Sequence, residues 1–115
     1  MNLHDLKWSA KEKKVARGAF DKAYKQEVRQ IHKEVYEKVK SFREENDVWK
    51  LHDYLSGKRK EIDEKYDYRY SVLIYVIARL MREGFIKEED LEGLSQDKLL
   101  KIKGLSKKEE PAVRS

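Results

Sequence analysis

An apolar repeat at steps of three and four runs through residues 15–42, and it constrains the fold more than any other feature. Its members are Val15, Ala16, Ala19, Phe20, Ala23, Tyr24, Val28, Ile31, Val35, Val39 and Phe42. No Gly or Pro interrupts the repeat after Gly18, and Ser9 and Glu12 have the spacing of a capping box, which favours a helix start. The sequence therefore predicts one helix over residues 10–44, roughly 50 Å long at about 1.5 Å per residue.

A helix of that length is longer than a compact domain of 115 residues is wide. Much of its apolar stripe would therefore not be covered by the rest of the same chain. A second copy is the simplest cover, because a two-fold interface uses one patch twice. We therefore expect a homodimer whose interface includes Val28, Ile31 and Val35.

Two shorter helices are predicted after the long one. Asn46 and Asp47 are good N-cap residues, so a second helix is expected over residues 48–66. Residues 70–81 are apolar on all sides, which indicates a buried central helix. The β-branched residues of this segment would also suit a strand. Helix is preferred because the segment continues to Gly84, a residue type expected just after a helix end.

The last third of the chain has weaker signals. Residues 87–91 resemble a short helical turn, and Ser95 can cap a small helix over residues 95–103, with Gly104 just past its end. Residues 105–115 offer little to bury, so we expect a disordered charged tail. The predicted fold is all-α: a single helical domain over residues 1–104, with a long N-terminal helix followed by shorter helices. It would form a helical bundle-like homodimer with a small C-terminal helical head.

Composition excludes several classes of protein. Cys is absent, which excludes disulfide frameworks, Cys-ligated zinc and thiol catalysis. The longest apolar run, residues 72–78, is far shorter than the roughly 17 to 25 residues that span a bilayer. The chain start does not resemble a signal peptide, so we expect a cytoplasmic protein. His4, His32 and His52 lie far apart in the sequence, and no phosphate-binding glycine loop is present, so neither a metal nor a cofactor is expected.

The net charge of +5 raises the question of nucleic-acid binding. Charges of opposite sign alternate at helical spacing, as in Asp21 with Lys25 and Glu34 with Lys38, which is typical of a solvated helix face. A basic helical nucleic-acid-binding protein is therefore the less favoured alternative. It would use the basic residues of the first helix, Lys11, Lys13, Lys14 and Arg17 among them.

The second predicted helix contains two polar residues, His52 and Arg59, within an otherwise apolar stripe. Trp49 and Asp53 lie on the neighbouring face. In the structural interpretation, Trp49 packs on the first helix, His52 is partly buried, and Asp53 and Arg59 form ordinary surface ion pairs. In the functional interpretation the four residues bind a protein, because Trp and Arg often dominate interface energies. Arg59 would then be exposed and unpaired in the free protein.

A hydrolytic role for His52, Asp53 and Ser56 is disfavoured. A serine nucleophile in the middle of a helix would have no glycine-rich turn to supply the donors of an oxyanion hole. We therefore expect no catalytic residue.

The segment Asp47-Val48-Trp49-Lys50-Leu51-His52-Asp53-Tyr54-Leu55-Ser56-Gly57-Lys58-Arg59 resembles the fluorescence recovery protein family. Similarity extends over roughly residues 18–104. The resemblance implies an all-helical, non-enzymatic homodimer that binds photoactivated orange carotenoid protein. Such a dimer speeds the return of that protein from the red to the orange form and its release from the phycobilisome.

The same resemblance assigns Trp49, His52, Asp53 and Arg59 to the functional patch and links Tyr75 and Lys101 to partner contact in the head region. The lysine-rich first helix and the charged tail depart from the family pattern. A fluorescence-recovery-like dimer with a different, unknown protein client, acting as a scaffold or chaperone-like helper, is therefore the alternative.

Overall fold

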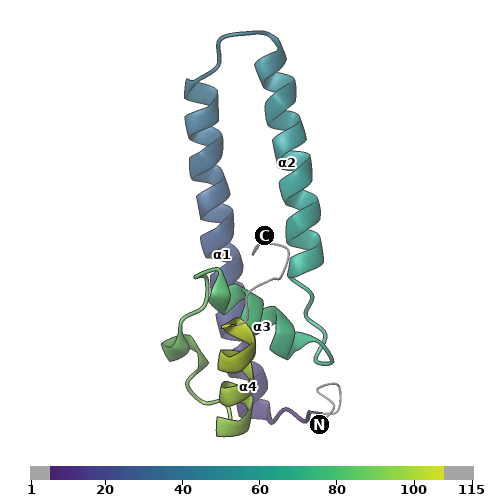
Figure 1. The fold of residues 1–115 in the computed structure, drawn as a ribbon, viewed down its shortest axis with the longest axis vertical. Helices are drawn as coiled ribbons and strands as arrows, with labels where there is room; N and C mark the ends of the chain where they lie inside the picture. The colour runs from purple at the N-terminus through teal and green to yellow at the C-terminus, as the bar shows by residue number, and fades with distance from the viewer. Residues whose placement is uncertain (1–5, 108–115) are drawn as a thin grey trace.

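The computed structural model describes residues 6–107, and within this range it contains helices and no strand. The elements are α1 (Ala10–Lys40), α2 (Asn46–Lys65), α3 (Leu73–Arg82), the 3-10 helix η2 (Glu88–Leu91) and α4 (Gln96–Ser106). The second part of α1 and all of α2 form a hairpin stem, and the first part of α1 packs with α3, η2 and α4 in a head (Figure 1). The predicted all-α class is confirmed. His4 and residues 108–115 of the predicted tail lie outside the described range.

The long helix begins as predicted and ends earlier. The Ser9 hydroxyl accepts the Glu12 amide at 3.1 Å, and the Glu12 carboxylate accepts the Ser9 amide at 3.1 Å, so the capping box is confirmed. The helix ends at Lys40, not near residue 44. Asp47 explains the early end, because its carboxylate accepts the amides of Arg43 and Glu44 and holds the chain in a turn.

The expected N-cap pair is instead inside the second helix. α2 begins at Asn46, and Glu45 precedes it without a side-chain cap, so the predicted start at residue 48 was two residues late. The hydrogen bonds from the backbone amides of the turn lower the pKa of the Asp47 carboxyl.

The core lies in the head. Its buried residues come from the first part of α1, from α3, from α4 and from the segment around η2: Ala16, Ala19, Phe20, Ala23, Leu73, Ile74, Val76, Ile77, Ala78, Leu80, Ile86, Leu91, Leu94 and Ile102. The alanines of α1 let α3 approach closely, and each large apolar side chain contributes about 1.5 to 3 kcal/mol when buried. The stem beyond the head has no comparable core.

Two predictions for the later helices were wrong in detail. α3 starts at Leu73, and Tyr75 is 47% exposed, so the central helix is not buried on all sides. One face of α3 packs on the core and the other reaches solvent. Gly84 follows the end of α3 with a φ of +89°, as predicted. Gly104, in contrast, lies inside α4, which continues to Ser106 instead of ending at residue 103.

A buried lysine joins the stem to the head. The Lys65 side chain at the end of α2 is 1% exposed, and its Nζ donates to Glu27 of α1 at 2.6 Å and to Glu83 after α3 at 2.7 Å. The Tyr66 hydroxyl donates to the second oxygen of Glu27 at 2.8 Å, and Arg79 donates to Glu83 at 2.9 Å. The cluster therefore fixes the end of α2 to both α1 and α3.

A second buried pair closes the head. Lys98 of α4 donates to the Glu12 carboxylate at 3.1 Å and to the Lys7 carbonyl at 2.6 Å. The Ser95 amide donates to the other Glu12 oxygen at 2.8 Å. Burial opposes ionisation of Glu12, but the amides of Ser9 and Ser95 and the Lys98 ammonium outweigh it and lower the pKa of the carboxyl to about 2.

We expect Lys65→Met to destabilise the protein by about 3 to 5 kcal/mol, because Glu27 would remain buried without a cation and Glu83 would keep only Arg79. Urea unfolding followed by circular dichroism measures the change. Adding Glu27→Gln should restore part of the loss, since it removes the buried unpaired charge. A loss below about 1 kcal/mol for Lys65→Met would contradict the assigned role.

Glu12→Gln should destabilise the protein by about 2 kcal/mol at neutral pH, because the ionised carboxylate is favoured in the folded chain. The pKa of Glu12 is lower when folded than its ordinary value of 4.5, so this stabilisation is complete above that value and is lost as the pH falls toward 2. The free-energy difference between wild type and variant, from urea unfolding at several pH values, should shrink over this window. A difference that is independent of pH would contradict it.

Candidate functional site

Three of the predicted partner-binding residues form one exposed cluster on the stem. Trp49 is 64% exposed, and its ring meets the His52 ring edge-on with centroids 6.3 Å apart. His52 Nδ1 lies 3.3 Å from the Asp53 carboxylate, and both side chains are exposed. Trp49 therefore does not pack on α1, and His52 is not partly buried, so the structural interpretation fails for both residues.

Arg59 lies about 15 Å further along α2, at about 1.5 Å per residue. Its side chain is 80% exposed, as predicted, but it is not unpaired: Nε donates to both carboxylate oxygens of Asp63, at 3.0 and 3.2 Å. The carboxylate one helical turn away explains this, since residues at i and i+4 are neighbours on a helix. The hydrogen bond to Asp63 raises the pKa of the guanidinium. The pair uses Nε alone, so the terminal nitrogens stay available to a ligand.

An apolar groove of about 290 Å³ runs between the two stem helices beside Arg59. This stem groove is lined by Tyr24, Val28, Ile31, Leu55 and Ile62, with Lys58 and Arg59 at its edge. It contains two of the three predicted dimer residues, and Val28 is 42% exposed. Val35, the third, is half-buried one turn further along α1. The sequence identified both apolar stripes, but it did not show that they face one groove.

A polar bridge joins the two helices near the middle of the stem, and no sequence pattern predicted it. The Tyr54 hydroxyl of α2 donates to the Glu34 carboxylate of α1. Lys38 and Lys58 lie over the Tyr54 ring, with Nζ 4.4 and 5.8 Å from its centroid. Burial and the bond to Glu34 raise the pKa of Tyr54 to about 12, and the same bond lowers the pKa of Glu34. This bridge holds α2 beside α1 while leaving the outward face of α2 free.

Tyr75 and Lys101 belong to the head, on α3 and α4, whereas Trp49 and its neighbours lie in the outer part of the stem (Figure 1). Lys101 is half-buried and donates to Asp97 at 2.5 Å. The six predicted residues therefore do not form one continuous surface. Leu100, next to Lys101, is 67% exposed and was missed, because the weak apolar pattern of α4 does not show which face turns outward.

The side chains exposed on α2 are of types that suit protein binding. His52 turns toward Asp53, and Ser56 makes no side-chain hydrogen bond in the described part of the chain. No group of three or more His, Cys, Asp or Glu side chains is placed to hold a metal within residues 6–107. No helix in the same range is long and apolar enough to cross a membrane. An exposed indole, an imidazole, a carboxylate and a guanidinium on one rigid helix can bind a complementary protein face.

Comparison with known proteins agrees with the sequence motif. The family described as photoprotection regulator fluorescence recovery protein matches residues 8–106. The fluorescence recovery protein of Synechocystis sp. PCC 6803 is 44% identical over 100 residues, covering 87% of this chain and 92% of that protein. The solved structure of the Fremyella diplosiphon fluorescence recovery protein superposes with a TM-score of 0.83 at 46% identity, covering 89% of this chain and 100% of that one.

The solved structure of the Synechocystis protein gives the same TM-score of 0.83 at 43% identity, again over 89% of this chain and 100% of that one. The match thus includes the stem, the head and the exposed α2 residues together. The chain therefore belongs to the fluorescence recovery protein family of photoprotection regulators.

Proposed function

We propose that this protein binds the photoactivated form of an orange carotenoid protein and accelerates its return from the red to the orange form, without catalysing a covalent reaction. It would also promote the release of that protein from the phycobilisome. The observation that carries the proposal is the exposed cluster of Trp49, His52 and Asp53, with the exposed Arg59 further along the same helix, in a chain of a photoprotection-regulator family.

The exposed indole of Trp49 supports this assignment. A Trp side chain that is 64% exposed in a protein with 43% charged residues contributes little to folding, whereas its burial at an interface contributes strongly to binding. Arg59 adds a planar donor group that suits a carboxylate or an aromatic ring of the partner. Tyr75 and Lys101 would contribute a second contact from the head.

We further propose that two copies pair through the stem groove. Val28, Ile31 and Leu55 line an apolar surface that the head of the same chain does not cover, above the buried Ile62. A second stem would remove this surface from water and would use the same residues twice. Pairing of two stems would also give the partner site a rigid, two-sided support.

Such a regulator acts by differential binding. It must bind the compact or recombining form of a two-domain partner more tightly than the separated form, or lower the barrier between them. A rigid scaffold that contacts both partner domains raises their effective concentration for each other. The stem cluster and the head residues supply two such contacts on one molecule.

Val28→Glu combined with Ile31→Glu should disrupt the dimer, because buried unpaired charge costs several kcal/mol. Gel filtration with light scattering should give about twice the chain mass of 13.8 kDa for wild type and the chain mass for the variant. Tyr36→Glu is the matched control, since this exposed residue of the same helix does not line the groove. A wild-type mass near 13.8 kDa at micromolar concentration would reject the dimer.

Arg59→Leu should abolish or strongly reduce the acceleration of dark red-to-orange recovery of a photoconverted orange carotenoid protein. Loss of an interface-centre residue costs about 2 kcal/mol or more, roughly thirtyfold in affinity. The melting temperature should change little, because the Arg59–Asp63 pair is exposed and surface ion pairs contribute little to stability.

Lys87→Leu is the control for this experiment, since it removes one exposed charge in the head. No acceleration by wild type would reject the carotenoid-protein assignment. A collapsed melting temperature in Arg59→Leu would show that Arg59 is structural.

A further inference from the structure

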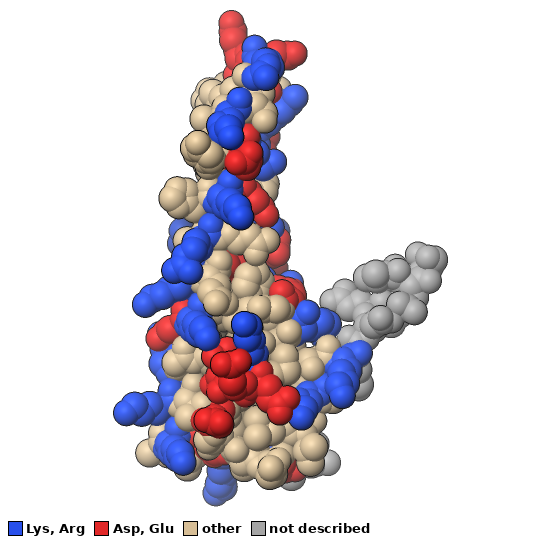
Figure 2. Space-filling model, turned by 90° about the vertical axis from the view of Figure 1, so that its left-hand side faces the viewer, with Lys and Arg blue, Asp and Glu red and all other residues tan. Residues whose placement is uncertain are grey.

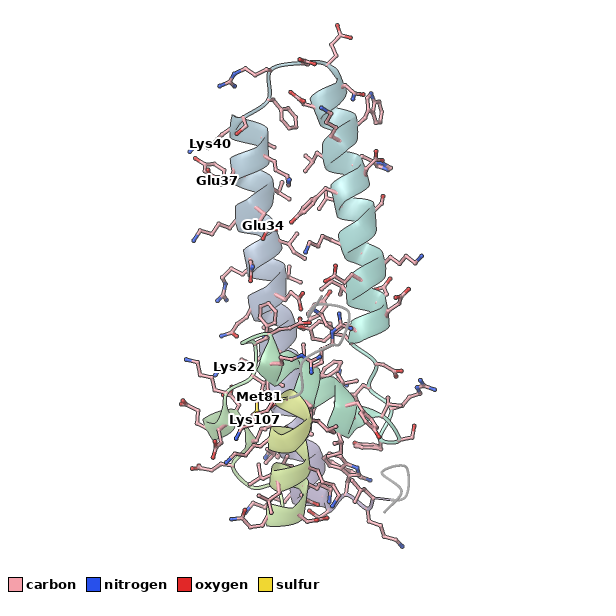
Figure 3. The ribbon with its side chains drawn as sticks, viewed as in Figure 1. Lys22, Glu34, Glu37, Lys40, Met81 and Lys107 are labelled. Atoms are coloured by element: carbon pink, nitrogen blue, oxygen red, sulfur yellow. The ribbon has the colours of Figure 1, made fainter. Side chains whose placement is uncertain are left out.

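One side of α1 carries a continuous row of cations. At about 100° per residue, seven basic residues fall within an arc of about 100° that contains no Asp or Glu of the helix. This basic row consists of Lys11, Lys14, Lys22, Lys25, Arg29, Lys33 and Lys40, and all seven are exposed. Figure 2 shows Lys and Arg side chains following one another down the stem, and Figure 3 shows Lys40 pointing away from α2.

Most of the row has no partner within the chain. Lys22 pairs with Asp90 at 2.7 Å and Lys40 with Glu37 at 3.8 Å. The other five, Lys11, Lys14, Lys25, Arg29 and Lys33, form no ion pair or hydrogen bond among residues 6–107. The structure therefore leaves five neighbouring cations uncompensated along one face.

The carboxylates that the sequence placed beside these lysines pair elsewhere. The expected pairs of Asp21 with Lys25 and of Glu34 with Lys38 do not form. Asp21 binds Arg17 at 3.3 Å, and Glu34 accepts from Tyr54. The acidic residues of η2 form a separate cluster low on the same view (Figure 2). The predicted solvated helix face is confirmed, since these lysines are exposed. The charges that alternate in the sequence nevertheless lie at different angles around the helix, so the row itself carries cations without carboxylates.

The basic row borders the stem groove but is centred on another side of α1. Its centre lies about a third of a turn around the helix from Val28, Ile31 and Val35, while Lys25 and Arg29 line a pocket together with Tyr24 and Val28. Pairing through the stem groove would therefore cover the edge of the row and leave its centre exposed. The Trp49 cluster is on a different helix. Nothing in the folding of the described chain requires this many cations in one line, and each repels its neighbours.

We propose that the basic row of α1 is a second docking surface, and that it binds an acidic face of a protein partner. Lys11 to Lys33 spans 22 residue steps, or about 33 Å along the helix axis. Lys11 and Lys14 lie about 4.5 Å apart along the axis, and after a gap of about 16.5 Å Lys25, Arg29 and Lys33 follow at steps of about 6 Å. Carboxylates on folded surfaces are separated by comparable distances, such as the one-turn spacing of about 5 to 6 Å along a helix.

The spacing of the cations suits an acidic protein face better than duplex DNA or an anionic membrane surface. Duplex DNA carries one charge per about 1.7 Å, so the row would neutralise a small fraction of the phosphates it faced. An interfacial membrane helix needs a broad apolar face beside its cations. The row itself has one exposed large apolar residue, Tyr36, and the Lys40 ammonium lies over that ring at 5.1 Å. The exposed Tyr24 and Val28 beside the row line the stem groove, which the proposed second copy would cover.

The test compares two variants of equal net charge. Lys25→Gln, Arg29→Gln and Lys33→Gln together remove three cations from the row, whereas Lys7→Gln, Lys87→Gln and Lys107→Gln remove three exposed cations elsewhere. The probe is a synthetic helical peptide with a row of glutamates on one face, and its binding is followed by fluorescence anisotropy at low and moderate salt. The row variant should bind about tenfold more weakly than wild type, and the control variant should bind like wild type.

Binding of a short DNA duplex and of phosphatidylserine vesicles is measured in parallel, to test the two alternative kinds of partner. Equal weakening of peptide binding in both variants would overturn the proposal, because net charge alone would then explain it. Tighter binding of duplex or vesicles than of the peptide, lost only in the row variant, would overturn the assignment to a protein partner. Melting temperatures of both variants should match wild type, so a loss of binding cannot come from unfolding. This result does not depend on whether Arg59 acts on a carotenoid protein.

Discussion

The buried ammonium of Lys65 is the interaction on which the arrangement of the molecule depends. It is the point where α2, α1 and the end of α3 meet, and its two carboxylate partners come from helices far apart in sequence. A buried ion pair of this kind adds little net stability compared with apolar packing, but it permits few alternative geometries. Here it sets the direction in which α2 leaves the head, and therefore the position of every residue on the stem.

The stem depends on that junction because it has almost no core of its own. Beyond the head, α1 and α2 are joined by the Tyr54–Glu34 bridge and by the residues of the stem groove. A hairpin held at its base and near its middle keeps two long faces exposed. One is the α2 face with Trp49 and Arg59, and the other is the basic row of α1. The same scarcity of internal packing leaves the apolar stem groove open to the proposed second copy and the α2 face open to the proposed partner.

The two exposed faces differ in the physics of recognition. The α2 face offers an aromatic ring and a forked donor, which give affinity by being buried. The basic row offers dispersed charge, which steers encounter and weakens with salt. If both proposed surfaces bind a partner, the basic row would raise the rate of encounter by long-range attraction, and the central contacts of the α2 face would set specificity.

Much of the fold could be predicted from the sequence because it is encoded locally. The capping box at Ser9 and the Gly84 that follows α3 each act within a few residues of chain, and both are as predicted. The apolar repeat correctly predicted the long helix, which ends at Lys40 instead of near residue 44. The motif from Asp47 to Arg59 identified the family for the same reason, since its residues lie on consecutive turns of one helix.

Features that join distant segments were decided by the tertiary structure alone. Which helices meet determines the partners of Lys65 and Lys98, the Tyr54–Glu34 bridge and the exposure of Tyr75. No short-range sequence pattern predicts these contacts. Three other features are local in the chain: the pairing of Asp21 with Arg17, the early end of α1 and the Arg59–Asp63 pair. For each of them the sequence was compatible with more than one local arrangement. The folded structure selects one partner for each of these groups. Once a helix is formed and packed, each charged or capping side chain lies at a fixed angle and distance from its possible partners.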